Sequence, residues 1–361
     1  MVPCYRLGHL LRDCVESILA QTYEDFEILI MDDCSPDNTP EVAKSFSDPR
    51  VRHVRNEPNL GHLRNYNKGI GLARGKYVWL ISADDYLRRP YVLARYVELM
   101  ERNPQVGYAF CPAVGVKEKQ ETGLIAYSRC EPQDCIMSGH VWLRRLIRGN
   151  LVVAAAGMVR RECYEQLGAF PLNMPWAGDW YLWCLFALHH DVAYFEEPMV
   201  CYRDHDLSMT NQLTRTQALA CCEEEIEIQW DIKNRADKAG FAAMSGACLD
   251  AVSHVYATAT ARKRFGLPTP IMTVDQFEES LCRNTASERE RKWLRSSVFA
   301  AMGSEYYWQG DIAAAARSYD AALAVNPLQP RVIAKRGLML LGGAGGFFRN
   351  SLRSLALGAR K

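Results

Sequence analysis

Two pairs of adjacent aspartates follow apolar segments near the N-terminus. Asp32 and Asp33 come directly after residues 26–31, and Asp84 and Asp85 come shortly after residues 77–81. Carboxylates in such places can accept hydrogen bonds from a polar ligand or supply oxygen ligands to a hard divalent cation. Aspartates are also common in turns and at the starts of helices. The residue types therefore predict either a ligand site or two structural turns.

A further aspartate, Asp179, stands among aromatic residues within residues 176–183. Aromatic surroundings desolvate a carboxylate, which raises its pKa and makes it a better general base, whereas a nearby cation would lower that pKa. The structural alternative is an aspartate that caps a tryptophan-rich core helix. His205 is another titratable candidate, although an isolated histidine is more often a hydrogen-bonded structural residue than a ligand.

The charged residues almost balance, with 43 Lys and Arg against 42 Asp and Glu and a formal net charge of +1. No overall positive field would attract nucleic acid, so we expect no nucleic-acid partner. The 13 cysteines are scattered, without a CxxC pair or the spacing of a zinc site. Reduced thiols in a cytoplasmic protein are the simplest interpretation, and no apolar run is long enough to span a bilayer.

The spacing of apolar residues predicts the elements that carry these side chains. Strands and helices alternate over the first half of the chain, which indicates an α/β fold with a mostly parallel sheet flanked by helices. Ligands of such sheets bind at the carboxyl ends of the strands, where both aspartate pairs fall. The expected strands are residues 26–31, 51–55, 77–81, 106–110, 152–159 and 192–196, and the expected helices are residues 10–19, 40–46 and 63–73.

From about residue 214 the pattern is helical, with long runs over residues 217–239 and 242–265 and a break at 266–270. We therefore expect a first domain over residues 1–210 and an all-α domain over residues 211–361. Within the latter, residues 298–330 resemble one tetratricopeptide repeat, a helical hairpin with small residues where its helices touch. This hairpin is expected to be either structural or a surface for a protein partner.

Five short segments, in order and at family-like spacing, resemble family 2 glycosyltransferases of the GT-A fold. They are residues 2–6, 31–35, 59–61, 73–78 and 82–85, and the resemblance covers approximately residues 2–210. It implies a Rossmann-like domain that binds a nucleotide sugar. In this family a complete hydrophobic strand precedes the Pro-x-Tyr segment, whereas only Met1 and Val2 precede Pro3 here. Either the recorded start lies downstream of the true one, which we favour, or the chain tolerates an incomplete central strand.

The resemblance implies how the donor and the acceptor are handled. Pro3, Tyr5, Asp33 and Asp84 would bind the donor, with Asp33 contacting the nucleotide base, and a uracil N3–H suits a carboxylate acceptor. Asp179 lies in the place of the family's catalytic acid and would take the proton from the acceptor hydroxyl, so that the anomeric configuration inverts.

The resemblance also implies a divalent cation, Mg²⁺ or Mn²⁺, that bridges the diphosphate of the donor. Asp84, Asp85 and His205 would reach this cation. Ser82 replaces the first aspartate of the family's DxD motif, which leaves the number of ligands open. Arg203, in the same segment as His205, is an alternative partner for the phosphates.

We therefore expect an inverting glycosyltransferase that moves a sugar from a nucleotide donor, UDP-linked, to a saccharide, lipid-linked or protein acceptor in the synthesis of cell-surface polysaccharide or glycoconjugate. The alternative is a catalytically weakened nucleotide-sugar-binding or scaffold protein that acts through its helical tail. Nucleotidyl transfer would need a Gly-rich basic loop that residues 4–8 do not supply. Residues 331–361 carry seven basic residues and no acidic one among apolar side chains. That segment indicates either peripheral contact with the inner face of the cell membrane or ordinary terminal packing.

Overall fold

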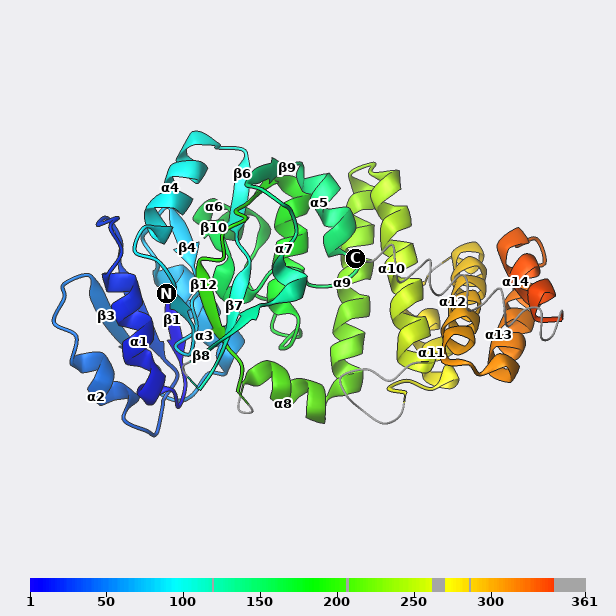
Figure 1. Cartoon of the computed structure of the whole chain (residues 1–361), viewed down its shortest axis with the longest axis horizontal. Helices are drawn as coiled ribbons and strands as arrows, with labels where there is room; N and C mark the ends of the chain where they lie inside the picture. Colours follow the sequence, from blue (N-terminus) through cyan, green and yellow to red (C-terminus); the bar gives the residue numbers. More distant parts are fainter. Residues whose placement is uncertain (119, 206–207, 262–269, 286, 341–361) are drawn as a thin grey trace. The chain divides into compact units, whose positions relative to one another are not determined.

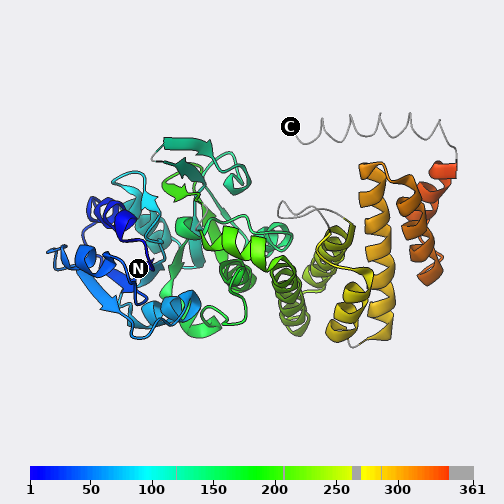
Figure 2. The same ribbon diagram turned by 90° about the horizontal axis from the view of Figure 1, so that it is seen from below.

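The chain folds into two compact units, and the computed structural model describes residues 1–118, 120–205, 208–261, 270–285 and 287–340 (Figure 1). The first unit consists of Met1–Leu213 together with Asp231–Ser245, and the second consists of Thr214–Trp230 together with Gly246–Lys361. In the described residues all strands belong to the first unit, while the second contains helices only (Figures 1 and 2). The basic tail over residues 341–361 and most of the predicted break at 266–270 lie outside the described residues.

The strands are short, and most follow the apolar runs of the sequence. They are β1 (Val2–Cys4), β2 (Ile28–Asp32), β3 (Val51–Arg55), β4 (Tyr77–Trp79), β5 (Tyr86–Leu87), β6 (Val106–Phe110), β7 (Ala113–Lys117), β8 (Gln120–Leu124), β9 (Cys135–Met137), β10 (Met158–Arg160), β11 (Asp191–Tyr194) and β12 (Val200–Arg203).

The helices of the α/β part alternate with these strands, and longer helices follow. They are α1 (Gly8–Leu19), α2 (Thr39–Lys44), α3 (His62–Leu72), α4 (Val92–Arg102), α5 (Gly139–Leu146), α6 (Arg161–Leu167), α7 (Gly178–His189), α8 (Met209–Thr216), α9 (Ala218–Lys238), α10 (Ala242–Ala261), α11 (Val274–Asn284), α12 (Glu288–Gln309), α13 (Ile312–Val325) and α14 (Pro330–Leu340).

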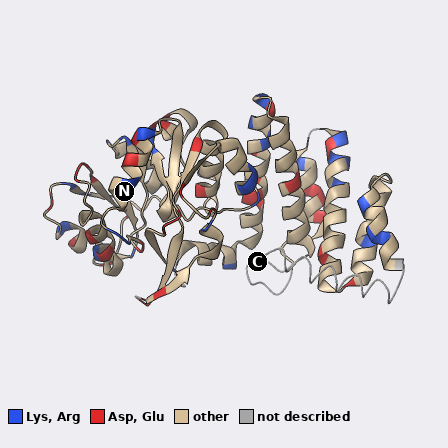
Figure 3. Ribbon diagram, turned by 45° about the horizontal axis from the view of Figure 1, so that its top comes forward, with Lys and Arg blue, Asp and Glu red and all other residues tan. Residues whose placement is uncertain are grey.

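Charged side chains of both signs are interspersed over the elements of each unit (Figure 3). This distribution agrees with the near-zero net charge of the sequence. None of the helices in the described part of the chain combines the length and the apolar character needed to cross a bilayer.

The first sheet places the Asp32–Asp33 turn at its carboxyl edge. It has the order β1-β2-β3 and is entirely parallel, with Cys4 opposite Asp32 and Asp32 opposite Arg55. Every residue of β2 is buried, as expected for a continuous apolar run in a sheet covered on both faces. Helix α1 contributes its apolar face, Leu11, Cys14, Val15 and Ile18, to the same core.

The other two sheets are mixed rather than parallel. The five-stranded sheet has the order β4-β10-β6-β11-β9, and β10 runs antiparallel to both β4 and β6. The four-stranded sheet has the order β5-β12-β7-β8, and β12 is parallel to β7 but antiparallel to β5. The expected parallel arrangement is therefore complete only in the first sheet, because an apolar run indicates a buried strand without indicating its direction.

The strand predicted over residues 152–159 is wrong in its first half. Residues Ala154–Ala156 form one turn of 3₁₀ helix, and only Met158–Arg160 pair as β10. The turn brings Gly157 against the indole of Trp183, where a Cβ atom at residue 157 would lie 2.5 Å from a ring carbon. Apolar composition alone does not distinguish such a buried turn from a strand.

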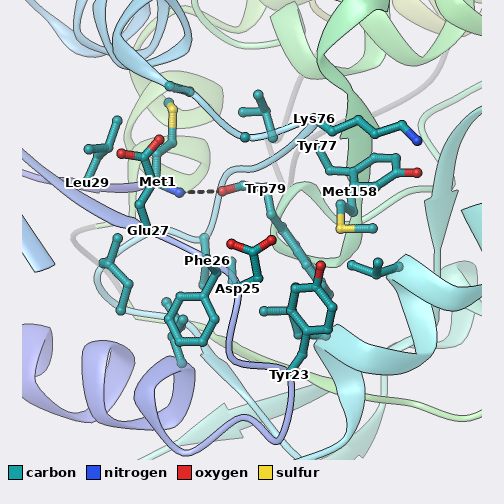
Figure 4. Close-up of a pocket in the computed structure, with 18 of the residues that line it drawn as sticks. Met1, Tyr23, Asp25, Phe26, Glu27, Leu29, Lys76, Tyr77, Trp79 and Met158 are labelled. Atoms are coloured by element: carbon teal, nitrogen blue, oxygen red, sulfur yellow. Dashed lines mark hydrogen bonds between the residues drawn. The ribbon is translucent and has the colours of Figure 1, made fainter. Parts of the chain in front are cut away.

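A groove of ≈ 590 Å³ lies beside the N-terminal end of β1 (Figure 4). Strand β1 lies between β2 and the segment after β4, since Ile81 N donates to Met1 O over 3.1 Å. The Met1 ammonium donates to Trp79 O over 2.7 Å, as the dashed line in Figure 4 shows. Leu29 and Tyr77 line the groove beyond it. Burial lowers the pKa of this ammonium to about 6.

In the second unit, α12 and α13 form a hairpin and lie side by side in both views (Figures 1 and 2). Gly310 ends α12 with a left-handed backbone, and Asp311 caps α13 by accepting a hydrogen bond from Ala314 N. Gly303 faces the ring of Tyr319 where the helices touch. A small residue at the contact lets the two backbones approach closely.

Candidate active site

The two aspartates at the end of β2 make different contacts. Asp32 is fully buried, and its carboxylate accepts hydrogen bonds from Ser35 N at 2.8 Å and from Arg55 Nη1 at 2.7 Å. Asp32 therefore stabilises the turn that follows β2. Asp33 accepts hydrogen bonds at Oδ1 from Asn56 Nδ2 at 2.9 Å and from Leu60 N at 2.8 Å. These donors fix the Asp33 carboxylate in the wall of a pocket.

Asp84 follows β4 and contacts a segment that is distant in the sequence. His205 Nε2 donates to Asp84 Oδ2 over 3.0 Å. Burial raises the pKa of Asp84, but hydrogen bonds from His205 and Ser82 outweigh it, so that this pKa lies below its usual value. In turn, Asp84 raises the pKa of His205. Among the described residues, Asp84 Oδ1 is buried without a hydrogen-bond partner.

Asp85, the next residue, is buried. Its Oδ1 accepts a hydrogen bond from Arg203 N over 3.0 Å, which joins the turn to the end of β12. Burial, followed by the negative charge of Asp84, raises the pKa of Asp85 well above its usual value. Within the described part of the chain, no group of three His, Cys, Asp or Glu side chains is arranged to hold a metal ion.

Asp179 lies in the first turn of α7. This helix is apolar on all sides and almost wholly buried, so it is anchored in the core. Trp180 N donates to Asp179 Oδ1 over 2.7 Å, and Asn150 Nδ2 donates to Oδ2 over 3.2 Å. Burial exceeds the effect of these donors and raises the pKa of Asp179 to about 6.

The seven predicted site residues line two adjoining pockets of the first unit. The larger pocket, of ≈ 860 Å³, is lined by Pro3, Tyr5, Asp33, Asp84 and His205. The smaller pocket, of ≈ 160 Å³, is lined by Asp84, Asp85 and Asp179. The walls of both include the same six residues, His62, Tyr66, Ser82, Asp84, Ser208 and Met209. Asp84 is therefore the predicted residue that belongs to both pockets.

Several side chains of the site were not singled out from the sequence. Tyr66 and His62 line both pockets, Trp183 lines the smaller one, and Asn150 contacts Asp179. His62 and Tyr66 are four residues apart on α3, which places them on one face, but the predicted helix began only at residue 63. No comparable local signal marks Asn150, because its partner Asp179 is distant in the sequence.

Comparisons with known proteins concern the N-terminal part of the chain and its fold. Residues 1–146 match the model of the family described as Glycosyl transferase family 2. Glycosyltransferase GlyG of Streptococcus pneumoniae serotype 4 is 36% identical over 108 residues, which cover 29% of this chain and 36% of GlyG. Glycosyltransferase GlyA of the same organism is 25% identical over 209 residues, covering 56% of this chain and 30% of GlyA. The chain thus spans about a third of the length of these curated relatives.

Among solved structures, S. aureus TarS 1–349 in complex with UDP is similar, with a TM-score of 0.60 and 14% identity. The match covers 91% of this chain and 89% of that one. This likeness confirms the predicted fold class, a GT-A unit followed by an all-α region. The family match is confined to residues 1–146, and the structural likeness concerns the fold.

Proposed function

We propose that the protein is an inverting glycosyltransferase that takes a sugar from a nucleotide-sugar donor, UDP-linked, and places it on a saccharide, lipid-linked or protein acceptor. One observation carries the proposal. Asp33 and Asp179 line two different pockets, and Asp84 lines both. A donor in the larger pocket and an acceptor in the smaller one would therefore meet at the shared wall.

The larger pocket suits the nucleotide. Asp33, held by Asn56 and Leu60 N, presents a fixed carboxylate that can accept the N3–H of uracil, with Pro3 and Tyr5 as further contacts. The TarS structure with UDP supports a uridine nucleotide as the first donor to test. Arg203 also lines this pocket and is placed to contact the diphosphate.

The residues present fit a divalent cation such as Mg²⁺ or Mn²⁺ held with the donor. Asp84 would be its main protein ligand, because Oδ1 is buried without a partner among the described residues. Asp85 and His205 are the neighbouring candidates, although each is already hydrogen-bonded. When bound, such a cation offsets the charge that develops on the leaving nucleoside diphosphate. One or two carboxylates plus phosphate oxygens are a usual ligand set for Mg²⁺.

Asp179 is proposed as the general base. A pKa of about 6 lies close to neutral pH, so the carboxylate is ionised in most molecules yet still basic enough to accept a proton. The base takes the proton from the acceptor hydroxyl as the hydroxyl oxygen attacks the anomeric carbon and the diphosphate leaves. A single displacement of this kind inverts the configuration. The aromatic residues of the smaller pocket, among them Trp176 and Phe170, suit the apolar face of a sugar.

The wider setting is part of the same proposal: a cytoplasmic enzyme of cell-surface polysaccharide or glycoconjugate synthesis. The α12–α13 hairpin, whose helices touch at Gly303 and Tyr319, would be either structural or a tetratricopeptide-like surface for a protein partner. Peripheral membrane contact through residues 331–361 stays a prediction from the sequence, because residues 341–361 lie outside the described residues.

The test is calorimetric titration of UDP-glucose, UDP-galactose, UDP-N-acetylglucosamine and GDP-mannose, with and without Mn²⁺. The parent protein is compared with Asp84→Ala/Asp85→Ala and, as a matched control, with Glu162→Ala/Glu165→Ala, two exposed acidic residues of α6 that line neither pocket. Cation-dependent binding that is lost only in the first variant supports the proposal. Equal binding in all three proteins would remove the cation assignment, and no binding to the parent would remove the donor site.

A second candidate function is a nucleotide-sugar-binding or scaffold protein with weakened catalysis. It is favoured by the absence of a three-ligand metal cluster in the described residues and by the raised pKa of Asp85. A measurement of turnover distinguishes the two candidate functions. Release of UDP from the bound donor in the presence of an acceptor supports the transferase, and tight donor binding without release supports the binding protein.

A further inference from the structure

Tyr66 lies in the wall shared by the two pockets. It belongs to helix α3 and follows His62 by one turn, so that both side chains are on the same face. Asp84, in the segment after β4, lines both pockets as well. If the proposed function holds, the sugar that is being transferred must pass this wall, because the donor and the acceptor occupy opposite sides of it.

The surroundings of Tyr66 hold its ring in place. Asn67 Nδ2 donates to Phe170 O over 2.8 Å, and Phe170 N donates to Asn67 Oδ1 over 2.9 Å. His62 Nε2 donates to Pro175 O over 2.9 Å. These bonds attach α3 to residues 170–175. The Tyr66 ring packs edge-to-face between Phe170, at 5.3 Å, and His62, at 5.6 Å.

The hydroxyl of Tyr66 is held in position by the packing of its ring, but no described residue makes a hydrogen bond to it. By contrast, His62 Nε2 and the side-chain amide of Asn67 are hydrogen-bonded. Burial and the negative charges of Asp84, Asp179 and Asp85 raise the pKa of Tyr66. The hydroxyl therefore stays protonated and can donate a hydrogen bond.

We propose that Tyr66 is a specificity-determining residue for the transferred sugar: its phenolic O–H donates a hydrogen bond to an oxygen of that sugar at the wall between the two pockets. The inference rests on the proposed function, and it concerns the sugar alone. The nucleotide is expected to be bound by the part of the larger pocket around Asp33 and Tyr5. Loss of the Tyr66 hydroxyl should therefore leave nucleotide affinity unchanged.

The test separates the sugar's contribution from that of the nucleotide. UDP and the nucleotide sugar from the panel that binds the parent most tightly are titrated into the parent, Tyr66→Phe and Tyr307→Phe. Tyr307 is a matched control, because it belongs to α12 of the second unit and lines neither pocket. Thermal unfolding of all three proteins checks that the fold is intact, and no change is expected, since the Tyr66 hydroxyl bonds to no described residue.

We expect the affinities of the three proteins for UDP to agree within about twofold. The additional affinity that the nucleotide sugar has over UDP should fall by about five- to tenfold in Tyr66→Phe alone. The kcat for transfer should fall in the same variant, because a misplaced sugar is attacked less often. An unchanged ratio of UDP to nucleotide-sugar affinity in Tyr66→Phe would overturn this inference and leave the proposed function standing. A parent protein that binds neither UDP nor any nucleotide sugar would instead overturn the proposed function itself.

Discussion

Asn150 Nδ2 donates a hydrogen bond to Asp179 Oδ2 over 3.2 Å, and Val152 N donates to Asn150 Oδ1 over 3.0 Å. The second bond orients the amide so that its N–H₂ group faces the carboxylate. This contact joins the loop before the Ala154–Ala156 turn to the start of α7. It stabilises the ionised form of Asp179 and so opposes the effect of burial.

The first prediction concerns the pH dependence of activity. If Asp179 is the base, it must be deprotonated, so kcat/KM should rise with pH and level off above about 6, the pKa of Asp179. Asp179→Asn should lower kcat by roughly 100-fold or more while donor affinity changes little. Steady-state rates between pH 5 and 8, with calorimetry of the donor, check both points. A flat profile below pH 6 would exclude Asp179 as the base.

The second prediction concerns Asn150. Asn150→Ala removes a donor that lowers the pKa of Asp179, so the acidic limb of the kcat/KM profile should move to higher pH. Activity at pH 6 should fall more than activity at pH 8. Asn103→Ala is a control, because Asn103 bonds to Leu99 O at the end of α4 and lines neither pocket. A uniform loss at every pH would show that Asn150 acts only on the shape of the pocket.

The third prediction concerns the α12–α13 hairpin. A Cβ atom at residue 303 would lie 2.6 Å from ring carbons of Tyr319, whose side chain is buried. Gly303→Ala should therefore destabilise the second unit by about 1–2 kcal/mol, even though alanine favours a helix. Gly246→Ala, in α10, is the matched control because a Cβ atom there meets nothing within 4 Å, and it should be neutral or stabilising. Thermal unfolding that ranks the two variants in the opposite order would contradict the close contact.

The sequence determined several of the local elements and the chemical types of the site residues. The runs at β2 and β6 are apolar over a strand's length, so their strands were predicted to within two residues. The aspartates after β2 and β4 were predicted at strand ends, and the resemblance named Asp33, Asp84 and Asp179. Each of these inferences rests on residues that are close together in the chain.

The tertiary structure decided which member of each acidic pair lines the larger pocket. Asp32 turns inward to Arg55, and Asp85 holds Arg203 N, whereas Asp33 and Asp84 line the larger pocket. It also decided that β10 runs antiparallel between β4 and β6, and that Tyr66 stands between the two pockets. The physical reason is that burial, hydrogen-bond partners and strand direction depend on segments far apart in the chain. Local sequence patterns carry residue type and spacing, but not the neighbours that folding supplies.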